Sequence, residues 1–420
     1  MRVFVLTLIH LLTGVLLSGL AVAETGLNVP VVVKQQGYIP FGEAPIHYRS
    51  EDLHDPVALL QLRMDRGEVH LQYEEGQSYL RSVLRELKIP VNSQTLVYSK
   101  TSFQYPKISP AKPRALYFND DVYVGRVHDG TALEFVSFDP MQGAIFYILD
   151  EHNVKQPRFE RSNLDCIQCH VANVPTRGVP GVMVRSVTTN PSGTQKGGTP
   201  SYISGHESPL SQRWGGWFVT GNLQQAHMGS RELPDTSFYL TGTSDVVAHL
   251  VLDHQTQMHN LITRTNYQTR LAIGSGSDAA RMQYESAVEQ LVRYLLFANE
   301  AKLEGPVAGN SGFAEEFAAR GPRDPLGRSL RDFDLHTRIF RYPCSYLIYS
   351  EAFDAIPEPA KSLIYRRLFD VLSGRDQSPV FASLSAGDRQ AILEILTATK
   401  PGVPAEWKQF LNQNERSTQQ

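Results

Sequence analysis

The residues that could do chemistry are concentrated in the five-residue stretch CIQCH at positions 166–170. One helical turn would bring the thiols of Cys166 and Cys169 and the imidazole of His170 to one side of the chain. Two thiols at this spacing can add to the two vinyl groups of a haem, and the adjacent imidazole can then bind its iron. The stretch therefore predicts one covalent haem c, attached at Cys166 and Cys169, with His170 as the proximal iron ligand.

Two other uses of these thiols compete with haem attachment. A structural zinc would need two further ligands, and without a second Cys-x-x-Cys it would have to borrow histidines such as His206 and His227. A thioredoxin-like redox pair should follow a strand and open a helix, whereas the residues before Cys166, RFERSNLD, are polar. Haem attachment is the interpretation that the motif favours.

The attachment residues must be held by a short helix. Ser162 or Asn163 can cap its amino end, and Pro175 can end it. The region that follows, 173–243, is rich in Gly, Pro and Ser and is too long for an ordinary connection. We expect this region to wrap around the ligand.

The sixth iron ligand is sought among the methionines and histidines downstream of the motif. Met228 is the first candidate, because it lies in the glycine-containing loop AHMGS, and ordinary loop packing is its alternative. His254 is the second, on the apolar stripe of a helix predicted to begin at Ser244, although a histidine on such a stripe is more often a hydrogen-bonded core residue. The remaining candidates are Met183, His206, His227, His249, Met258 and His259.

The segment RWGGWFVTG places two tryptophans around a pair of glycines. Trp214 and Trp217 would pack on a porphyrin while the glycines allow its close approach, and Arg213 would pair with a haem propionate. The alternative is the edge of a strand with aromatic core residues. Both interpretations stay open from the sequence.

The amino terminus has the pattern of a secretory signal peptide. Arg2 precedes an apolar run from Val3 to Val22, and the Ala-Val-Ala that closes it predicts cleavage after Ala23. An uncleaved anchor is the alternative, which His10 and the glycines of the run weaken. Because no later run reaches about 18 apolar residues, we expect a periplasmic or otherwise exported mature chain without a membrane span.

Composition narrows the class of partner. The 420 residues carry a net charge of −3, which argues against nucleic acid because phosphate binding needs a basic face. Three cysteines, two of them three residues apart, make a poor disulfide framework even for an exported protein. Cys344 is expected to be a small buried residue.

Hydrophobic periodicity predicts an α+β fold. A helix capped by Asp55 and a second helix up to Pro90 precede a small antiparallel sheet between Gln94 and Asp150. From Ser244, expected as a helix cap, the chain becomes largely α-helical, with further helices over 278–303 and 359–411. The expected domains are a signal peptide (1–23), a mixed α+β domain (24–155), a haem-binding cytochrome c-like region (156–270) and a helical region (271–420).

Several longer motifs are spread along the chain: FNDDVYVG, GVPGVMVRSV after the CxxCH, RWGGWFVTG, HMG, SDVVAHLVLDHQTQMHNLITR and YPCSYLIYSEAFDAIP. Together they resemble a large uncharacterised bacterial family of exported proteins that contain a cytochrome c domain. The resemblance extends from about Asp55 to Pro404. It implies haem binding and electron transfer outside the cytoplasm, and it supplies no distal ligand.

Three functions suit a single haem in a chain of this length. A simple electron carrier needs only about 100 residues, so the favoured function is single-electron transfer with the remaining chain docking a redox partner protein. A peroxidase- or oxidase-like enzyme with an open distal site is an alternative, in which His254 or Arg213 would assist, although di-haem bacterial peroxidases carry two CxxCH motifs. A haem-based sensor is the third. Whether the chain is an enzyme, and its oligomeric state, stay open.

Overall fold

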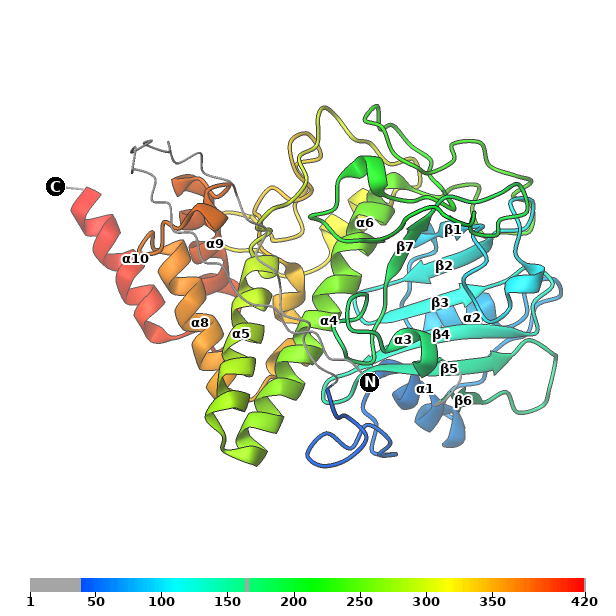
Figure 1. The fold of residues 1–420 in the computed structure, drawn as a ribbon, viewed down its shortest axis with the longest axis horizontal. Helices are drawn as coiled ribbons and strands as arrows, with labels where there is room; N and C mark the ends of the chain where they lie inside the picture. The colour runs from blue at the N-terminus through cyan, green and yellow to red at the C-terminus, as the bar shows by residue number, and fades with distance from the viewer. Residues whose placement is uncertain (1–38, 163–165, 419–420) are drawn as a thin grey trace, which may run out of the picture. The chain divides into compact units, whose positions relative to one another are not determined.

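A seven-stranded antiparallel sheet packs beside a set of helices (Figure 1). The structure is a computed structural model that describes residues 39–162 and 166–418, so the predicted signal peptide lies outside the described residues. The strands are, in their order across the sheet, β6 (Phe159–Arg161), β5 (Gly143–Asp150), β4 (Ala132–Asp139), β3 (Val122–Arg126), β2 (Arg114–Phe118), β1 (Thr95–Val97) and β9 (Trp217–Phe218). Strands β1 to β5 come from the segment in which the sequence predicts a sheet, and this prediction is confirmed.

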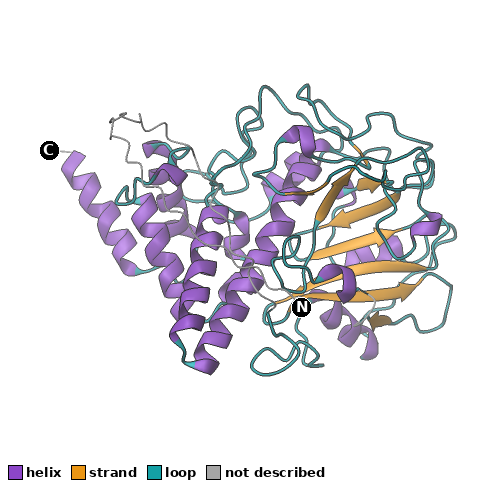
Figure 2. Ribbon diagram, in the orientation of Figure 1, coloured by secondary structure: helices purple, strands orange, loops and turns teal. Residues whose placement is uncertain are grey.

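The chain after residue 245 is largely helical, and Figure 2 shows these helices as a group next to the strands. The described residues form ten α-helices: α1 (Pro56–Asp65), α2 (Leu80–Glu86), α3 (Ile167–His170), α4 (Val246–Ser275), α5 (Asp278–Leu295), α6 (Phe313–Ala319), α7 (Glu351–Asp354), α8 (Glu358–Leu372), α9 (Ala386–Thr399) and α10 (Ala405–Thr418). The predicted α+β class and helical carboxyl-terminal half are confirmed.

Two predicted helix boundaries are wrong. Asp245, and not Ser244, caps α4, because its carboxylate accepts hydrogen bonds from two backbone N–H groups of the first turn. The Ser244 hydroxyl instead connects the backbones of β1 and β9. Helix α5 ends at Leu295 rather than at residue 303, because Phe297 has a φ of 54° and a left-handed residue cannot continue the helix.

The two faces of the sheet pack against different helices. Because side chains alternate along a strand, Phe135 and Ile145 join the hydrophobic cluster of α1 and α2. Their neighbours Val136 and Phe146 join the cluster that contains α4. We call this second face, defined by Val136 and Phe146, the α3 face, because α3 lies over it in Figure 1.

Helix α4 is buried around its whole circumference over most of its length. The predicted apolar stripe is only part of this surface, because the polar residues Asp253, Gln257 and Asn260 are buried as well. Each of the three is hydrogen bonded to a residue far away in the sequence. Because each buried polar group has a hydrogen-bond partner, its burial costs little free energy. Through these hydrogen bonds α4 contacts segments that lie far from it in the sequence.

The predicted domain boundaries at 155/156 and 270/271 stay predictions. Strands β6 and β9, from the predicted haem-binding region, complete the sheet, and α4 runs across position 270. The segment 173–243 is mostly loop. It contains a separate two-stranded sheet made of β7 (Val184–Val187) and β8 (Ser201–Ser204).

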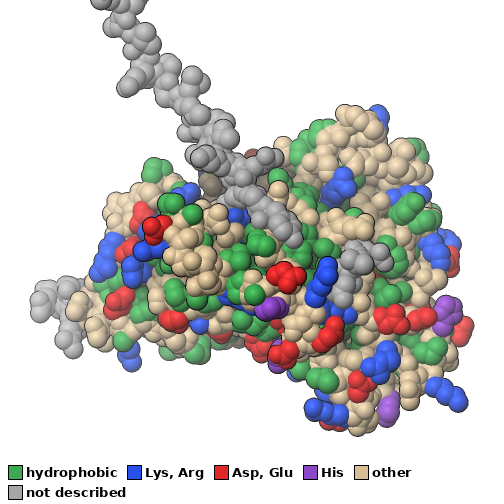
Figure 3. All heavy atoms as spheres, turned by 60° about the horizontal axis from the view of Figure 1, so that its bottom comes forward, with side chains coloured by type: hydrophobic (Ala, Val, Ile, Leu, Met, Phe, Trp, Pro, Cys, Tyr) green, Lys and Arg blue, Asp and Glu red, His purple; other side chains and the backbone are tan. Residues whose placement is uncertain are grey.

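The surface carries charges of both signs. Figure 3 shows basic and acidic side chains intermixed on the face that it presents. Among the helices of the described residues, none has both the length and the apolar character that a membrane span needs.

Candidate functional site

The three residues of the CxxCH motif lie on one turn at α3. The backbone N–H groups of Cys169 and His170 both donate to the carbonyl oxygen of Cys166, at 3.1 and 2.9 Å. Cys166 itself occupies the capping position of α3. The prediction that Ser162 caps this helix is therefore wrong, and the alternative cap, Asn163, lies outside the described residues. The Ser162 hydroxyl instead accepts a hydrogen bond from the Cys166 thiol at 3.4 Å. Cys169 is exposed and Cys166 is half-buried.

The imidazole of His170 is oriented by a backbone carbonyl. Its Nδ1 lies 2.8 Å from the carbonyl oxygen of Gly181. Because a carbonyl oxygen can only accept, Nδ1 carries the proton and Nε2 presents its lone pair. The ring also contacts Phe146 of the α3 face, with centroids 4.9 Å apart, and burial lowers the pKa of the imidazole. His170 is therefore a neutral imidazole whose Nε2 keeps a free lone pair.

The loop after α3 is held by α4. Helix α3 ends at His170, before the predicted stop at Pro175, and the backbone N–H of Gly181 donates back to the His170 carbonyl oxygen at 3.0 Å. The side chain of Asn260 binds both the N–H and the carbonyl oxygen of Val182, at 3.0 and 2.7 Å. A Cβ at Gly181 would overlap the Asn260 side-chain oxygen, so this approach requires glycine. A single α4 side chain thus fixes the segment that orients the imidazole.

An ion pair lies on the α3 face near His170. Arg114 of β2 and Glu134 of β4 are 2.5 Å apart from Nη2 to Oε2, and only 19% and 12% of their side chains are exposed. Gly125 of the intervening strand β3 makes room for the pair, because a Cβ there would overlap the Arg114 guanidinium. Besides the larger effect of burial, Arg114 lowers the pKa of His170 and Glu134 raises it.

The donors at α3 and the surface beneath them fit a covalent haem. Two thiols one turn apart and an imidazole with a satisfied Nδ1 are the groups that such a haem requires. The α3 face adds the half-buried apolar side chains of Leu116, Val136 and Ile148, on which an apolar macrocycle can pack. The buried Nε of Arg114, which lacks a hydrogen-bond partner in the described residues, is a cationic donor for an acidic group on this face.

Arg213 and Trp214, predicted haem contacts, lie in a buried network around Asp253 of α4. The Arg213 guanidinium and the Trp214 indole N–H both reach the same carboxylate oxygen of Asp253, at 3.2 and 3.0 Å. Arg213 also donates to the carbonyl oxygens of His206 and Ser208, each at 2.8 Å. Burial raises the pKa of Asp253 to about 7, although Arg213 opposes this. Pairing of Arg213 with a propionate would require this network to open.

His254, a predicted sixth ligand, is hydrogen bonded at both ring nitrogens. Its Nδ1 lies 2.8 Å from Nδ1 of His206, and its Nε2 lies 2.8 Å from the hydroxyl of Ser345. Both imidazoles stack with Tyr294 and Phe297. Burial lowers the pKa of His254 to about 3, so the ring is neutral. These are the contacts of a core histidine, and ligation of iron would require one of them to break.

Trp217 and Met228, the remaining predicted site residues, both contact β7. The Trp217 indole N–H donates to the Arg185 carbonyl oxygen at 2.8 Å, and the Met228 sulfur accepts a hydrogen bond from the Ser186 hydroxyl at 3.7 Å. Met228 is half-buried, and β7 begins at Val184, three residues after Gly181, which orients the His170 imidazole. The structure thus collects Trp217 and Met228 at one strand, and their roles toward a haem stay predictions.

The zinc alternative requires ligands besides the two thiols. Within residues 39–162 and 166–418, no group of three or more His, Cys, Asp or Glu side chains is arranged to hold a metal ion. His206 belongs to the stack with His254, and Nδ1 of His227 accepts a hydrogen bond from the backbone N–H of Gly229 at 3.1 Å.

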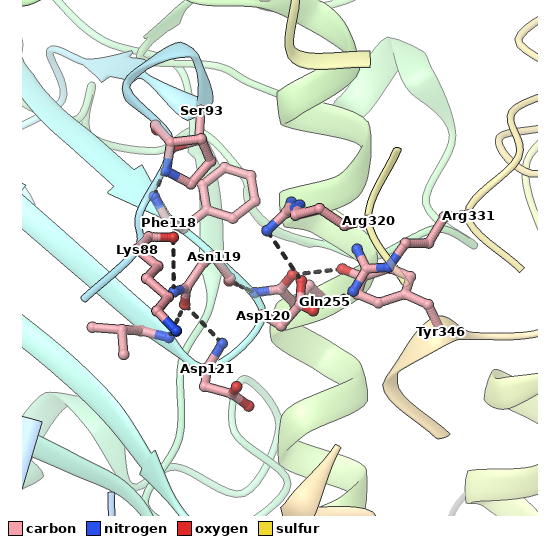
Figure 4. Close-up of polar contacts among 12 residues, drawn as sticks. Lys88, Ser93, Phe118, Asn119, Asp120, Asp121, Gln255, Arg320, Arg331 and Tyr346 are labelled. Carbon is pink, nitrogen blue, oxygen red and sulfur yellow. Dashed lines mark hydrogen bonds and ion pairs between the residues drawn. The ribbon is translucent and has the colours of Figure 1, made fainter. Parts of the chain in front are cut away.

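A second group of charged side chains surrounds the turn between β2 and β3 (Figure 4). The residues of this turn belong to the motif FNDDVYVG. Asp120 forms ion pairs with Arg331 and, at 3.9 Å, with Arg320. The turn borders a cavity of about 550 Å³ that residues of α1, α2 and α7 also line. The Asp121 carboxylate points away from the contacts drawn in Figure 4, and burial and neighbouring carboxylates raise its pKa to about 7.

The sequence did not identify the residues that shape the surroundings of α3. They are Arg114, Glu134, Phe146, Gly181 and Asn260. Their contacts join segments that lie far apart in the sequence, so no local spacing marks them. The glycines and prolines that follow the CxxCH motif predict a loop rich in turns. This composition is the local feature of the sequence that points to the loop containing Gly181.

No protein-family model, curated protein or solved structure matches this chain.

Proposed function

We propose that this protein is an exported mono-haem c-type cytochrome that passes single electrons between redox partner proteins. The observation that supports the proposal is the joint placement of two thiols and a neutral imidazole on one turn. The His170 Nδ1 proton is bound by the Gly181 carbonyl oxygen, which leaves Nε2 for iron. A bound haem would supply a reversible one-electron reduction of its iron.

Each part of the site has a role in this proposal. The thiols of Cys166 and Cys169 would each add across one vinyl group of the haem, with sulfur bonding to one carbon and hydrogen to the other, so that no oxidant would be consumed. His170 would bind the haem iron through Nε2, and the Gly181 carbonyl oxygen holds the orientation of the ring. The apolar side chains of the α3 face would exclude water from one side of the haem. The remaining chain is available to dock the electron donor and acceptor.

A haem enzyme or sensor with an open sixth coordination position is the second candidate. The observation that favours it is that both predicted sixth ligands are hydrogen bonded elsewhere: His254 to His206 and Ser345, and Met228 to Ser186. An iron without a sixth protein ligand binds small molecules directly. This candidate shares the attachment residues and differs only in the distal ligand.

Visible spectra of the protein expressed with a haem-maturation system distinguish the two candidates. The samples are the air-oxidised protein, the dithionite-reduced protein and the reduced protein with carbon monoxide, each compared with Met228→Leu. A carrier with a Met228 ligand shows a long-wavelength methionine–iron band that Met228→Leu loses, and it does not respond to carbon monoxide. Ready binding of carbon monoxide by the unmodified protein selects the enzyme or sensor, and a protein that takes up no haem contradicts both.

A further inference from the structure

We propose that the ion pair between Arg114 and Glu134 sets the reduction potential of the haem that His170 would hold. The inference rests on the proposed function, since a potential requires a bound haem. It assigns a role to two charged residues that no motif contains. Their charges would act on the haem iron through space, and neither side chain would bind the iron.

The sheet register places the pair beside the proximal ligand. On the α3 face, Val136 of β4 pairs with Phe146 of β5, whose ring contacts His170. Glu134 lies two residues from Val136 on the same face, which makes it a diagonal neighbour of Phe146, about 7–8 Å away. Arg114 reaches Glu134 across the glycine of β3. Both charges therefore lie on the face over which the imidazole is held.

Glu134 is anchored independently of Arg114. Its Oε1 accepts hydrogen bonds from the Ser102 hydroxyl at 2.6 Å and from the Gln104 amide at 2.8 Å, whereas Oε2 binds Arg114. Removal of the guanidinium would thus leave a carboxylate in the same place. Removal of the carboxylate would leave Arg114, whose Nε already lacks a hydrogen-bond partner in the described residues, as an uncompensated cation.

The sign of each effect follows from Coulomb's law. Reduction adds one electron to the iron, so a nearby cation favours the reduced state and a nearby anion disfavours it. Because both side chains are largely buried, solvent screens their charges only partly. In the intact pair, the effects of the cation and of the anion on the reduction potential oppose each other. Neutralising one side chain should therefore leave the effect of the other charge on the potential.

The test compares the haem midpoint potentials of the unmodified protein, Arg114→Gln, Glu134→Gln and the double variant. Arg114→Gln should lower the potential, Glu134→Gln should raise it, and the double variant should return towards the unmodified value. Arg338→Gln is the matched control, because Arg338 forms a similarly buried pair, at 2.6 Å, with Asp388 of α9, a helix that Figure 1 shows away from the sheet. It should leave the potential unchanged.

The outcomes separate this inference from the proposed function. Haem that is covalently attached while both single variants shift in the same direction, or do not shift, overturns the electrostatic role and leaves the cytochrome proposal intact. Failure of the unmodified protein to retain haem overturns both. If Arg114→Gln does not fold, the comparison of Glu134→Gln with the double variant tests the inference. The double variant should have the lower potential of the two, because it lacks the Arg114 cation. Equal potentials of these two variants would contradict the electrostatic role of Arg114.

Discussion

The Nδ1 of His170 and the carbonyl oxygen of Gly181 lie 2.8 Å apart, and the Gly181 N–H donates in return to the His170 carbonyl oxygen. This reciprocal pair joins the CxxCH turn to the loop that α4 holds. It fixes which ring nitrogen carries the proton. Orientation of the His170 imidazole therefore depends on backbone atoms eleven residues away and on the helix behind them.

Gly181→Ala should destabilise the protein by about 1–3 kcal/mol, the usual cost of forcing a side chain into a filled site. The added methyl would overlap the Asn260 side-chain oxygen. The free energy of unfolding from urea denaturation measures the effect. Gly197→Ala is the control, because a Cβ at that exposed position meets no atom within 4 Å. Equal stability of both variants would contradict the close packing between the loop and α4.

Asn260→Leu should leave the N–H and carbonyl oxygen of Val182 without their side-chain partner. Each unsatisfied buried group costs about 1–3 kcal/mol. We expect lower stability and faster hydrogen exchange at the Val182 amide, which NMR or mass spectrometry can follow. Exchange at Val182 that matches the unmodified protein would show that Asn260 does not hold the loop.

Asp121→Asn should change how stability depends on pH. The folded carboxyl has a pKa of about 7 against 3.8 for the ordinary group, so folding takes up a proton between these values and stability falls as the pH rises from about 4 to 7. The amide removes this loss. At pH 8 the variant should be more stable than the unmodified protein by on the order of 1–2 kcal/mol, allowing for solvent screening at this half-buried group.

Thermal or urea denaturation at pH 5 and pH 8 measures the difference. An advantage of Asp121→Asn that is equal at the two pH values would contradict a titrating carboxyl at this position.

Cys344→Ser should leave the haem spectrum unchanged and lower the stability. Cys344 is fully buried, and burial raises the pKa of its thiol, so it acts as a small apolar residue. A serine hydroxyl without a partner there costs about 1–3 kcal/mol. Absorbance at the Soret band and urea denaturation check the two parts. A lost or shifted Soret band would connect this cysteine to the haem site.

The sequence predicts local features of this fold better than long-range ones. Asp55 caps α1 as expected, and strands β1 to β5 lie in the predicted segment, because capping and alternation are read within a few residues. The burial of α4 around its whole circumference, over most of its length, was not predictable, since Gln257 and Asn260 find their partners in the loop after α3. Strand β9 has two residues, too few for an alternating pattern, and it lies at the edge of the sheet beside β1.

The same limit applies to the site. The spacing of Cys166, Cys169 and His170 predicts a shared turn because it is local. Arg213 was predicted as the cation for a haem because of its neighbours in sequence, yet its guanidinium pairs with Asp253, whereas Arg114 lies on the face beneath His170. A charge pair that spans three strands leaves no pattern in a linear sequence.

Acid–acetone extraction tests covalent attachment of haem at the CIQCH turn most directly. The protein is expressed with a haem-maturation system, extracted, and examined by haem staining on a denaturing gel beside Cys166→Ala/Cys169→Ala and Cys344→Ser. We predict that haem stays with the unmodified protein and with Cys344→Ser, and that the double variant loses it to the solvent. Haem that is extracted from all three proteins, or never bound by any, would contradict the account.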